Sequence, residues 1–277
     1  MEKITTRADM RHYAARHGAE TGFVPTMGYL HEGHLSLVER SRAENRRTVV
    51  SIFVNPAQFN DPGDLEKYPV DLERDFAMLR AAGVDAVFCP PRAEIYPRGV
   101  PPLQMAYPDL MRRLCGAARP GHFEGVLLIV HNLLQWVQPA NAYFGLKDYQ
   151  QYLLIKKMAL DLEFTTNIVG CPLVRESDGL AMSSRNVRLS ANGRTQALAL
   201  SRSLFHAADL WKNGHTVAEL RSALASGMAS LRTDYAEVCD AHTLEPLHDE
   251  ATRKAETLIA VAAFVDHVRL IDNVLID

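Results

Sequence analysis

The sequence predicts an α/β protein: a doubly wound parallel sheet over residues 1–175, followed by a smaller α+β domain over residues 176–277. Short apolar runs alternate with helical patterns through the first part, as expected of βαβ units. After residue 175 the order changes to helical segments followed by strand-like runs. With 277 residues, of which 47% are hydrophobic and 23% charged, the chain can bury a sizeable core.

Five short apolar runs supply the predicted parallel strands, and a long apolar run supplies a buried helix. The strands cover residues 22–26, 48–54, 85–89, 142–145 and 166–171. The helix covers residues 126–137 and is apolar around most of its circumference. A helix of this kind is expected between the sheet and neighbouring helices.

Two further helices follow from apolar residues three or four positions apart, over 72–79 and over 154–162. Asp148 precedes the second helix and is a suitable N-cap. Alternating strands and helices of this length indicate a sheet covered on both faces.

The second domain is predicted from a different order of elements. Helices are expected over 192–212 and 217–231, and strands over 236–239, 258–264 and 268–271. Acidic residues outnumber basic ones after residue 175, whereas the two are nearly balanced before it. The first domain is therefore the better place for an anionic ligand.

Composition excludes several classes of protein. Thirty basic and 33 acidic residues give a net charge of −3, which argues against tracking nucleic-acid phosphates. The four cysteines form no Cys-x-x-Cys pair, as expected of reduced thiols in a cytoplasmic protein. The longest apolar run is too short and too interrupted to span a membrane, and the first residues do not resemble a secretory signal. We expect a cytoplasmic protein.

The most informative segment runs from residue 22 to 38, where a strand passes through Pro25 and Gly28 into a helix starting near His31-Glu-Gly-His34. Ligands of parallel sheets bind at the carboxyl ends of strands. Two histidines three apart share one face of the first helical turn, where backbone N–H groups attract phosphate. An isolated His-x-x-His is more often a surface or metal-binding pair. The spacing is one residue short of the His-Glu-x-x-His zinc motif, and both common phosphate-binding glycine loops are absent.

His31-Glu-Gly-His34 resembles the His-Ile-Gly-His box of the nucleotidyltransferase and class I aminoacyl-tRNA synthetase superfamily, whose Rossmann-like domain binds ATP without a P-loop. The wider sequence resembles the pantothenate synthetase (pantoate–β-alanine ligase) family. Five segments in family order carry this resemblance: VPTMG at 24–28, SIFVNPAQF at 51–59, RPGHFEG at 119–125, AYFGLKDYQQ at 142–151 and VRESDGLAMSSRN at 174–186.

The resemblance implies an ATP site. Its residues would be Met27, Gly28, Tyr29, Leu30, His31, Glu32, Gly33, His34, Gly145, Leu146, Lys147, Asp148, Val174, Met182, Ser183, Ser184 and Arg185. The catalytic residues among them would be His34, His31, Lys147, Ser183 and Arg185. The resemblance makes His34 the general acid and His31 its phosphate-binding neighbour. The hydroxyls and guanidinium of 182–185 suit the β- and γ-phosphates, although such a string is also typical of a turn and helix cap.

The resemblance also implies a pantoate and β-alanine site formed by Gln58, Gln151 and Asn55. Amides offer donors and acceptors to hydroxyls and a carboxylate without adding charge. Asp75 is a candidate for a carboxylate associated with Mg²⁺, and equally for a partner of its helix dipole. Residues 60–68 resemble the mobile flap of the family. Members of the family are typically homodimers, so the resemblance also implies a homodimer.

Several positions depart from the usual residues of the family, among them Val70, Leu128, Asn132, Ala140 and Leu146. None removes a proposed catalytic group, but they bear on the pocket wall and flap. The resulting expectation is an ATP-dependent ligase that joins pantoate to β-alanine through a pantoyl adenylate. The alternatives are a nucleotidyltransferase that delivers AMP to a phosphate-bearing acceptor, and a nucleotide sensor without turnover.

Overall fold

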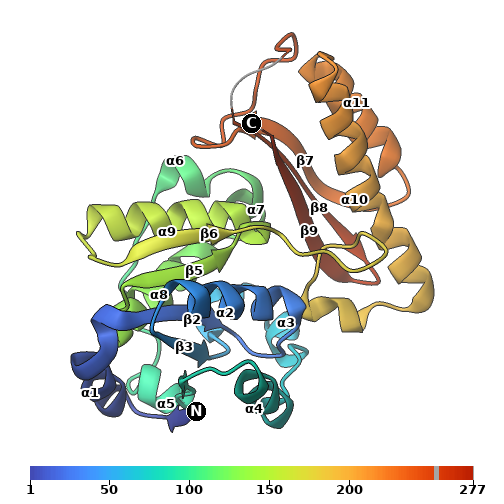
Figure 1. Cartoon of the computed structure of the whole chain (residues 1–277). Helices are drawn as coiled ribbons and strands as arrows, with labels where there is room; N and C mark the ends of the chain where they lie inside the picture. Colours follow the sequence, from blue (N-terminus) through green and yellow to red (C-terminus); the bar gives the residue numbers. More distant parts are fainter. Residues whose placement is uncertain (253–255, 277) are drawn as a thin grey trace. The chain divides into compact units, whose positions relative to one another are not determined.

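The structure is a computed structural model that describes residues 1–252 and 256–276 (Figure 1). Its contacts divide the chain into two compact units, each described here by itself. The first unit holds Met1–Tyr107 and Arg119–Pro172. The second holds Pro108–Ala118 and the chain from Leu173 onward. The short segment 108–118 therefore belongs with the second unit although it lies within the first part of the sequence.

In the described part of the chain, six parallel strands form the sheet of the first unit, in the order β1-β4-β3-β2-β5-β6. They are β1 (Glu2–Ile4), β2 (Thr21–Thr26), β3 (Arg47–Ile52), β4 (Ala86–Phe88), β5 (Asn141–Gly145) and β6 (Asn167–Cys171). After β2 the chain adds β3 and β4 on one side and then β5 and β6 on the other. The predicted doubly wound sheet is confirmed. The direction in which successive strands are added to the sheet reverses between β2 and β5.

Helices cover both faces of this sheet. They are α1 (Arg7–His17), α2 (Glu32–Glu44), α3 (Pro62–Glu66), α4 (Leu72–Ala81), α5 (Arg92–Ile95), α8 (His122–Val137) and α9 (Tyr149–Asp161), with 3-10 turns η1 (Gly18–Glu20), η2 (Pro56–Gln58) and η3 (Leu146–Asp148). On one face α2 and α4 pack Leu37 and Leu79 onto Val24 and Val50. On the other face α8 places Trp136 against Phe88 of β4, with ring centroids 6.2 Å apart.

The helix α8 is buried around most of its circumference, as its apolar sequence predicts, and it contacts α1, α9 and η2. Its start packs closely on the turn that follows β3. A Cβ atom added to Gly125 would lie 2.2 Å from the carbonyl oxygen of Ala57. Only glycine permits this approach, which brings η2 against the helix.

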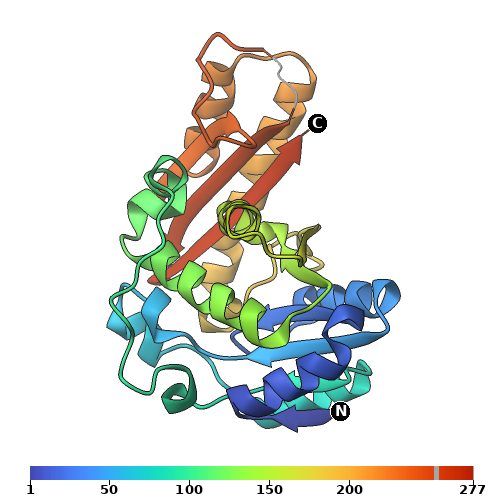
Figure 2. The ribbon, with the colours of Figure 1, turned by 90° about the vertical axis from the view of Figure 1, so that its left-hand side faces the viewer.

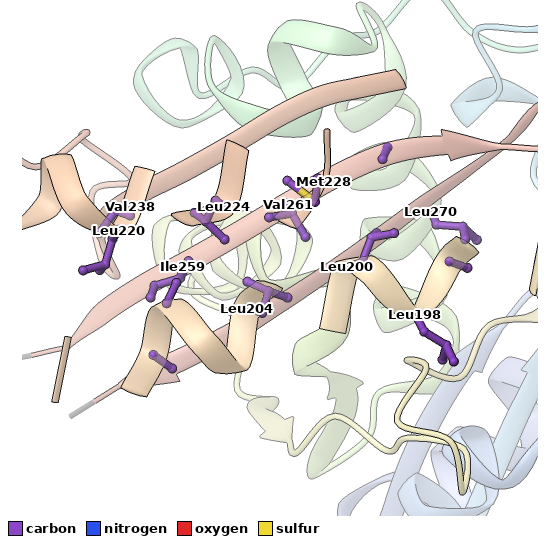
Figure 3. Packing of buried hydrophobic residues seen from close by; sticks show 14 of the residues in the cluster. Leu198, Leu200, Leu204, Leu220, Leu224, Met228, Val238, Ile259, Val261 and Leu270 are labelled. Carbon is purple, nitrogen blue, oxygen red and sulfur yellow. The ribbon is translucent and has the colours of Figure 1, made fainter. Parts of the chain in front are cut away.

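The second unit is an α+β structure, as predicted. Its described elements are α6 (Pro108–Met111), α7 (Leu114–Ala118), η4 (Ser184–Arg188), α10 (Ala191–Lys212), α11 (Val217–Gly227), β7 (Arg232–Asp240), β8 (Thr257–Val265) and β9 (Val268–Ile276). The strands are antiparallel in the order β7-β8-β9 and run side by side in Figure 2. Figure 3 shows leucines of α10 and α11 meeting Val238, Ile259 and Val261 of the sheet in one apolar core.

The boundaries differ from the sequence predictions in several places. β1 and α1 were not predicted, and residues 228–231 lie beyond the end of α11. The strands of the second unit are longer than the predicted apolar runs, because they also include polar residues such as Arg232 and Asp272 that lie outside those runs. Within the residues that the structure describes, none of the helices is both long and apolar enough to cross a membrane.

Candidate active site

Three neighbouring strands lead into the segments that the sequence singles out. The strands β3, β2 and β5 lie side by side, and their carboxyl ends precede residues 53–58, 27–34 and 146–148 respectively. The order of the sheet reverses between β2 and β5, which is where parallel α/β sheets bind ligands. The topology thus gathers the predicted site residues of the first unit at one edge of the sheet.

Residues 26–34, which we call the histidine turn, have an unusual backbone. Gly28 and Tyr29 both have positive φ angles, of 83° and 52°. Left-handed geometry is easy for glycine but uncommon for tyrosine. Thr26 Oγ1 accepts the backbone N–H of Gly28 at 3.1 Å. The conformation of the turn is therefore held by hydrogen bonds as well as by the strand that precedes it.

Asp75, in the first turn of α4, supplies two shorter hydrogen bonds to the same turn. Its Oδ2 accepts the backbone N–H of Tyr29 at 2.7 Å, and its Oδ1 accepts that of Leu30 at 2.8 Å. The carboxylate is completely buried. The guanidinium of Arg74 lies 3.8 Å from the carboxylate and 5.2 Å from the centre of the Tyr29 ring. Asp75 thus joins α4 to the histidine turn.

His31 and His34 lie together at the start of α2. His31 is the N-cap, and its backbone N–H donates to Nδ1 of His34 at 3.3 Å. The two ring centroids are 4.0 Å apart. Because Nδ1 of His34 accepts a hydrogen bond, the proton of the neutral ring is on Nε2. His34 can therefore donate from Nε2 to a ligand.

Loss of hydration lowers the pKa of His34 well below 6.5, and the charges of His31 and Lys147 lower it further. His34 is consequently a neutral imidazole near pH 7. The side chain of Lys147 is 20% exposed, and its ammonium lies 3.7 Å from Asp148. The charge of Lys147 thus acts on the imidazole of His34, and a cation of this kind also suits an anionic ligand.

Asn55 and Gln58 form what we call the amide cluster, together with Tyr96 and with Met27, which is also part of the histidine turn. Nδ2 of Asn55 donates to Oε1 of Gln58 at 3.0 Å. The hydroxyl of Tyr96 donates to Oδ1 of Asn55 at 2.8 Å, which fixes which way the Asn55 amide faces. Nε2 of Gln58 points to Sδ of Met27 at 3.3 Å. The structure thus brings together Asn55 and Gln58, both predicted for the pantoate site, and adds Met27, which the sequence analysis assigns to the ATP site.

The amide cluster is anchored to α8. Nδ2 of Asn55 also donates to the carbonyl of Gly125 at 3.0 Å. Nδ1 of His122 donates to the carbonyl of Gln58 at 2.7 Å, and Arg119 donates to Nε2 of His122 at 2.9 Å. These contacts explain the RPGHFEG segment, to which sequence reasoning gave no role. Tyr96 was missed altogether, because nothing in its local sequence indicates its partner 41 residues away.

The segment after β5 is open. An added Cβ on Gly145 would have no other atom within 4 Å, so the backbone leaves space for a ligand. Asp148 is the N-cap of α9 by position, as predicted, although its side chain does not accept a helix N–H. Gln151 lies in the first turn of α9 and is partly buried.

The remaining predicted ATP residues belong to the second unit. The backbone N–H of Met182 donates to the carbonyl of Val174 at 3.0 Å, which closes a hairpin before η4. Ser183 is the N-cap of η4, and its Oγ accepts the N–H of Arg185 at 3.2 Å. Ser183 therefore does act as a helix cap, the alternative that its sequence left open.

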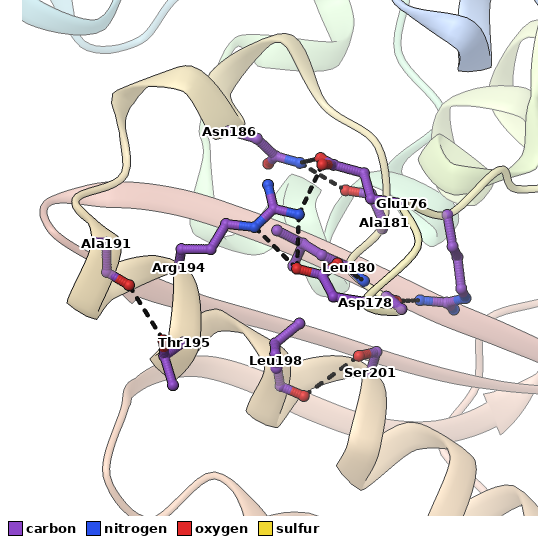
Figure 4. A network of polar contacts seen from close by, with 12 residues as sticks. Glu176, Asp178, Leu180, Ala181, Asn186, Ala191, Arg194, Thr195, Leu198 and Ser201 are labelled. Atoms are coloured by element: carbon purple, nitrogen blue, oxygen red, sulfur yellow. Dashed lines mark hydrogen bonds and ion pairs between the residues drawn. The ribbon is translucent and has the colours of Figure 1, made fainter.

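The hairpin is braced by an ionic network, shown in Figure 4. Arg194 of α10 binds Glu176 and Asp178, each at 2.7 Å. The amide of Asn186 donates to Glu176 at 2.7 Å and to the carbonyl of Ala181 at 3.0 Å. Residues 182–185 are thus presented by a braced loop.

Metal-ligating side chains do not cluster in the described part of the chain. Residues 1–252 and 256–276 contain no group of three or more histidine, cysteine, aspartate or glutamate side chains that could hold a metal ion. Both oxygens of Asp75 face backbone N–H donors, whose partial positive charges disfavour a cation at the same place. The prediction that Asp75 associates with Mg²⁺ is not supported by this geometry.

Comparison with known proteins gives one consistent result. Residues 2–275 match the family model described as pantoate-beta-alanine ligase. Curated relatives named pantothenate synthetase include one from Leptospira interrogans, 48% identical over 92% of this chain and 90% of that protein. Another, from Moorella thermoacetica, is 47% identical over 100% of this chain and 99% of that protein.

Solved structures agree with these relatives. The pantothenate synthetase of Thermus thermophilus has a TM-score of 0.93 and 46% sequence identity, with 99% of each chain covered. The pantoate-beta-alanine ligase of Francisella tularensis, in a complex with beta-gamma ATP and beta-alanine, has a TM-score of 0.82 and 34% identity. That match covers 99% of this chain and 97% of the other.

Proposed function

The chain belongs to the pantoate-beta-alanine ligase family, and from this premise we propose that it condenses pantoate with β-alanine to pantothenate while converting ATP to AMP and pyrophosphate. The observation that carries the proposal is the position of the histidine turn and the amide cluster after the neighbouring strands β2 and β3. The histidine turn provides hydrogen-bond donors for a polyphosphate, and the amide cluster provides amides for a hydroxy acid.

In the first step, a carboxylate oxygen of pantoate attacks the α-phosphorus of ATP. The bond from that phosphorus to the bridging oxygen of the β-phosphate breaks, and pyrophosphate leaves with the electron pair. The product is pantoyl adenylate, a mixed anhydride. Such a transfer depends mainly on positioning and on stabilisation of charge on the phosphate oxygens.

His34 would stabilise this charge as a neutral hydrogen-bond donor. Its Nδ1 accepts the N–H of His31, so the ring donates from Nε2–H. Its lowered pKa favours a neutral imidazole over an imidazolium acid. A general-acid role for His34 therefore stays a prediction from the resemblance, whereas the geometry favours a donor that keeps its proton. His31 would bind a neighbouring phosphate oxygen.

Cationic and hydroxyl groups would complete the ATP site. Lys147, which follows β5, would supply a positive charge to this site, and its charge lowers the pKa of His34. Ser183 and Arg185 of the second unit would bind the β- and γ-phosphates. Because Ser183 caps η4, its substitution also weakens the loop that carries Arg185.

Pantoate would bind at the amide cluster. Gln58 is held by Asn55 and by Met27, so its amide has a fixed direction. A preorganised amide binds a hydroxyl or carboxylate without an unfavourable reorientation. Gln151, in the first turn of α9, is proposed as the second pantoate amide, and Asn55 acts through Gln58.

In the second step, the amine of β-alanine attacks the acyl carbon of pantoyl adenylate. The bond from that carbon to the bridging oxygen breaks, AMP leaves with this oxygen, and the nitrogen loses a proton to form the amide. Mg²⁺ is proposed to arrive with ATP, since Asp75 does not fit as its ligand. The homodimer and the cytoplasmic location stay predictions.

The test is product stoichiometry. Purified protein is mixed with ATP, Mg²⁺ and D-pantoate, with or without β-alanine, and pyrophosphate, AMP and pantothenate are quantified. We expect equal amounts of all three products during turnover, and continued turnover only with β-alanine. Pyrophosphate release that needs another acceptor and no amine would instead favour a nucleotidyltransferase. ATP binding without any turnover would favour a nucleotide sensor.

A further inference from the structure

The buried carboxylate of Asp75 has a place in the fold that the proposed function leaves unexplained. It lies in the first turn of α4, whereas its partners Tyr29 and Leu30 lie 46 and 45 residues earlier in the chain. The side chain is wholly buried, and each oxygen accepts one backbone N–H, at 2.7 and 2.8 Å. Burying a carboxylate is unfavourable unless its hydrogen bonds are made, so these two donors, with the Arg74 guanidinium 3.8 Å away, define its environment.

Asp75 holds the part of the histidine turn whose backbone conformation most residues do not readily adopt. Gly28 and Tyr29 both have left-handed φ angles. A Cβ atom added to Gly28 would lie 3.0 Å from Oδ2 of Asp75 and 3.0 Å from Ile52. The turn is therefore pressed against the carboxylate, and the two hydrogen bonds favour a conformation that tyrosine otherwise avoids.

Four consecutive backbone donors of the turn are used inside the protein. The N–H of Gly28 donates to Thr26 Oγ1, those of Tyr29 and Leu30 donate to Asp75, and that of His31 donates to His34 Nδ1. The last of these bonds sets the tautomer of His34, and it forms only if the preceding residues have this path. Asp75 thus binds the backbone that leads directly into His31, the N-cap of α2.

We propose that Asp75 is a positioning residue for the ATP-binding histidine turn, acting through the backbone N–H groups of Tyr29 and Leu30 and without binding the metal. This inference rests on the proposed function in one respect, namely that the turn binds ATP. It assigns Asp75 a role that differs from that of a magnesium ligand, since a magnesium ligand would matter only when the metal is present.

The experiment compares ATP binding with and without magnesium. The variant is Asp75→Asn, which keeps the shape of the side chain but replaces one acceptor oxygen by an NH₂ group facing a backbone N–H. The matched control is Asp71→Asn, the same change at the exposed N-cap of the same helix, where asparagine also caps well. The dissociation constant for ATP is measured by calorimetry in excess Mg²⁺ and again in EDTA.

We expect Asp75→Asn to weaken ATP binding by about ten- to hundredfold, the effect of losing a charge-assisted hydrogen bond. The loss should be of similar size in Mg²⁺ and in EDTA, and Asp71→Asn should match the wild type in both. The KM for pantoate should stay within about twofold of the wild-type value, because the hydrogen bonds of Asp75 go to Tyr29 and Leu30 and not to Asn55 or Gln58. Unchanged ATP affinity, or a loss confined to Mg²⁺ and reversed by more Mg²⁺, overturns the proposal.

A second measurement needs no variant and covers the case in which Asp75→Asn fails to fold. Amide hydrogen exchange of Tyr29 and Leu30 is followed in the wild-type protein, free, with Mg²⁺ and with Mg-ATP. Slow exchange in all three states supports the proposal, because the carboxylate then keeps both N–H groups. Exchange that accelerates when Mg²⁺ binds contradicts it, because the carboxylate has then left them for the metal.

The failure of this inference is distinguishable from the failure of the proposed function. A protein that binds ATP but makes no pantothenate refutes the ligase reaction, yet the ATP affinity of Asp75→Asn still tests the positioning role. A protein that makes pantothenate with unchanged kinetics in Asp75→Asn refutes the positioning role alone. A wild-type protein that does not bind ATP refutes both.

Discussion

The histidine turn and the amide cluster follow neighbouring strands, yet they are built from different chemistry. The turn depends on a buried carboxylate, left-handed backbone and imidazoles. The cluster depends on neutral amides, a phenol and a thioether. The first arrangement fixes donors for a highly charged ligand, whereas the second orients hydrogen bonds without adding charge. Substitutions in the turn should therefore affect ATP and the chemical step, and substitutions in the cluster should affect pantoate.

The largest effect is expected from His34→Ala. Removing a donor to the charge that develops in the transition state should lower the rate of pyrophosphate release by about 100- to 1000-fold. His34→Gln should retain at least about tenfold more activity than His34→Ala, because an amide can donate a hydrogen bond in place of Nε2.

The rates are measured in single turnover with saturating pantoate. His12→Ala, an exposed histidine of α1, is the matched control and should behave as the wild type. If His34→Gln is as inactive as His34→Ala although both are folded, the neutral-donor role is wrong and a proton-transfer role becomes the better account.

Gln58→Ala tests the difference between the histidine turn and the amide cluster. It should raise the KM for pantoate by about tenfold and leave the KM for ATP within about twofold of the wild-type value. The reason is that Gln58 contacts Asn55 and Met27 and has no charged partner in the cluster. Steady-state kinetics with each substrate varied in turn measure both constants. Gln104→Ala, an exposed glutamine, serves as control. A larger change for ATP than for pantoate would break the division between the two regions.

A smaller effect is expected from Tyr96→Phe. Burial raises the pKa of Tyr96 to about 12, so its hydroxyl is a stable donor to Asn55 at neutral pH. Its loss should raise the KM for pantoate by about two- to fivefold. In a double-mutant cycle, the effect of Tyr96→Phe should vanish once Gln58 is alanine, because Tyr96 acts through Asn55 on Gln58. Tyr107→Phe is the matched control, and effects that simply add would refute this coupling.

The smallest change is expected from pH. The folded protein lowers the pKa of His34 below 6.5, so activity should vary by less than about twofold between pH ~6.5 and ~8 and decline only at lower pH. The unfolded chain protonates this histidine near its ordinary value, about 6.5. Stability contributed by neutral His34 is therefore present above about pH 6.5 and is lost as the pH falls below it. A titration of His34 by NMR with a midpoint above 6.5 would contradict both statements.

The sequence predicted those parts of the fold that depend on local pattern. Periodic apolar residues indicated the parallel strands, α8 and the order of elements in the second unit. β1 was missed because three residues are too few to show a period. The grouping of 108–118 with the second unit depends on contacts distant in sequence, and no local pattern encodes it.

The residues of the candidate site also fall into two groups, those that a local sequence pattern indicates and those that depend on contacts distant in sequence. His31, His34, Asn55 and Gln58 were found because they lie in short recognisable segments after strands. Asp75 was noticed as an acid at a helix start, but its true partners are backbone N–H groups contributed by the turn that follows β2. Tyr96 was not predicted, because the sequence around Tyr96 contains no pattern that indicates its hydrogen bond to Asn55.

The central claim is that pantoate attacks ATP through its carboxylate before the amine arrives, and transfer of an oxygen label tests it most directly. Pantoate labelled with ¹⁸O in both carboxylate oxygens is converted with ATP and β-alanine, and the AMP, pyrophosphate and pantothenate are analysed by mass spectrometry. One label should appear in AMP and one should remain in pantothenate. Label in pyrophosphate or phosphate, with none in AMP, would show an acyl phosphate instead and contradict the account.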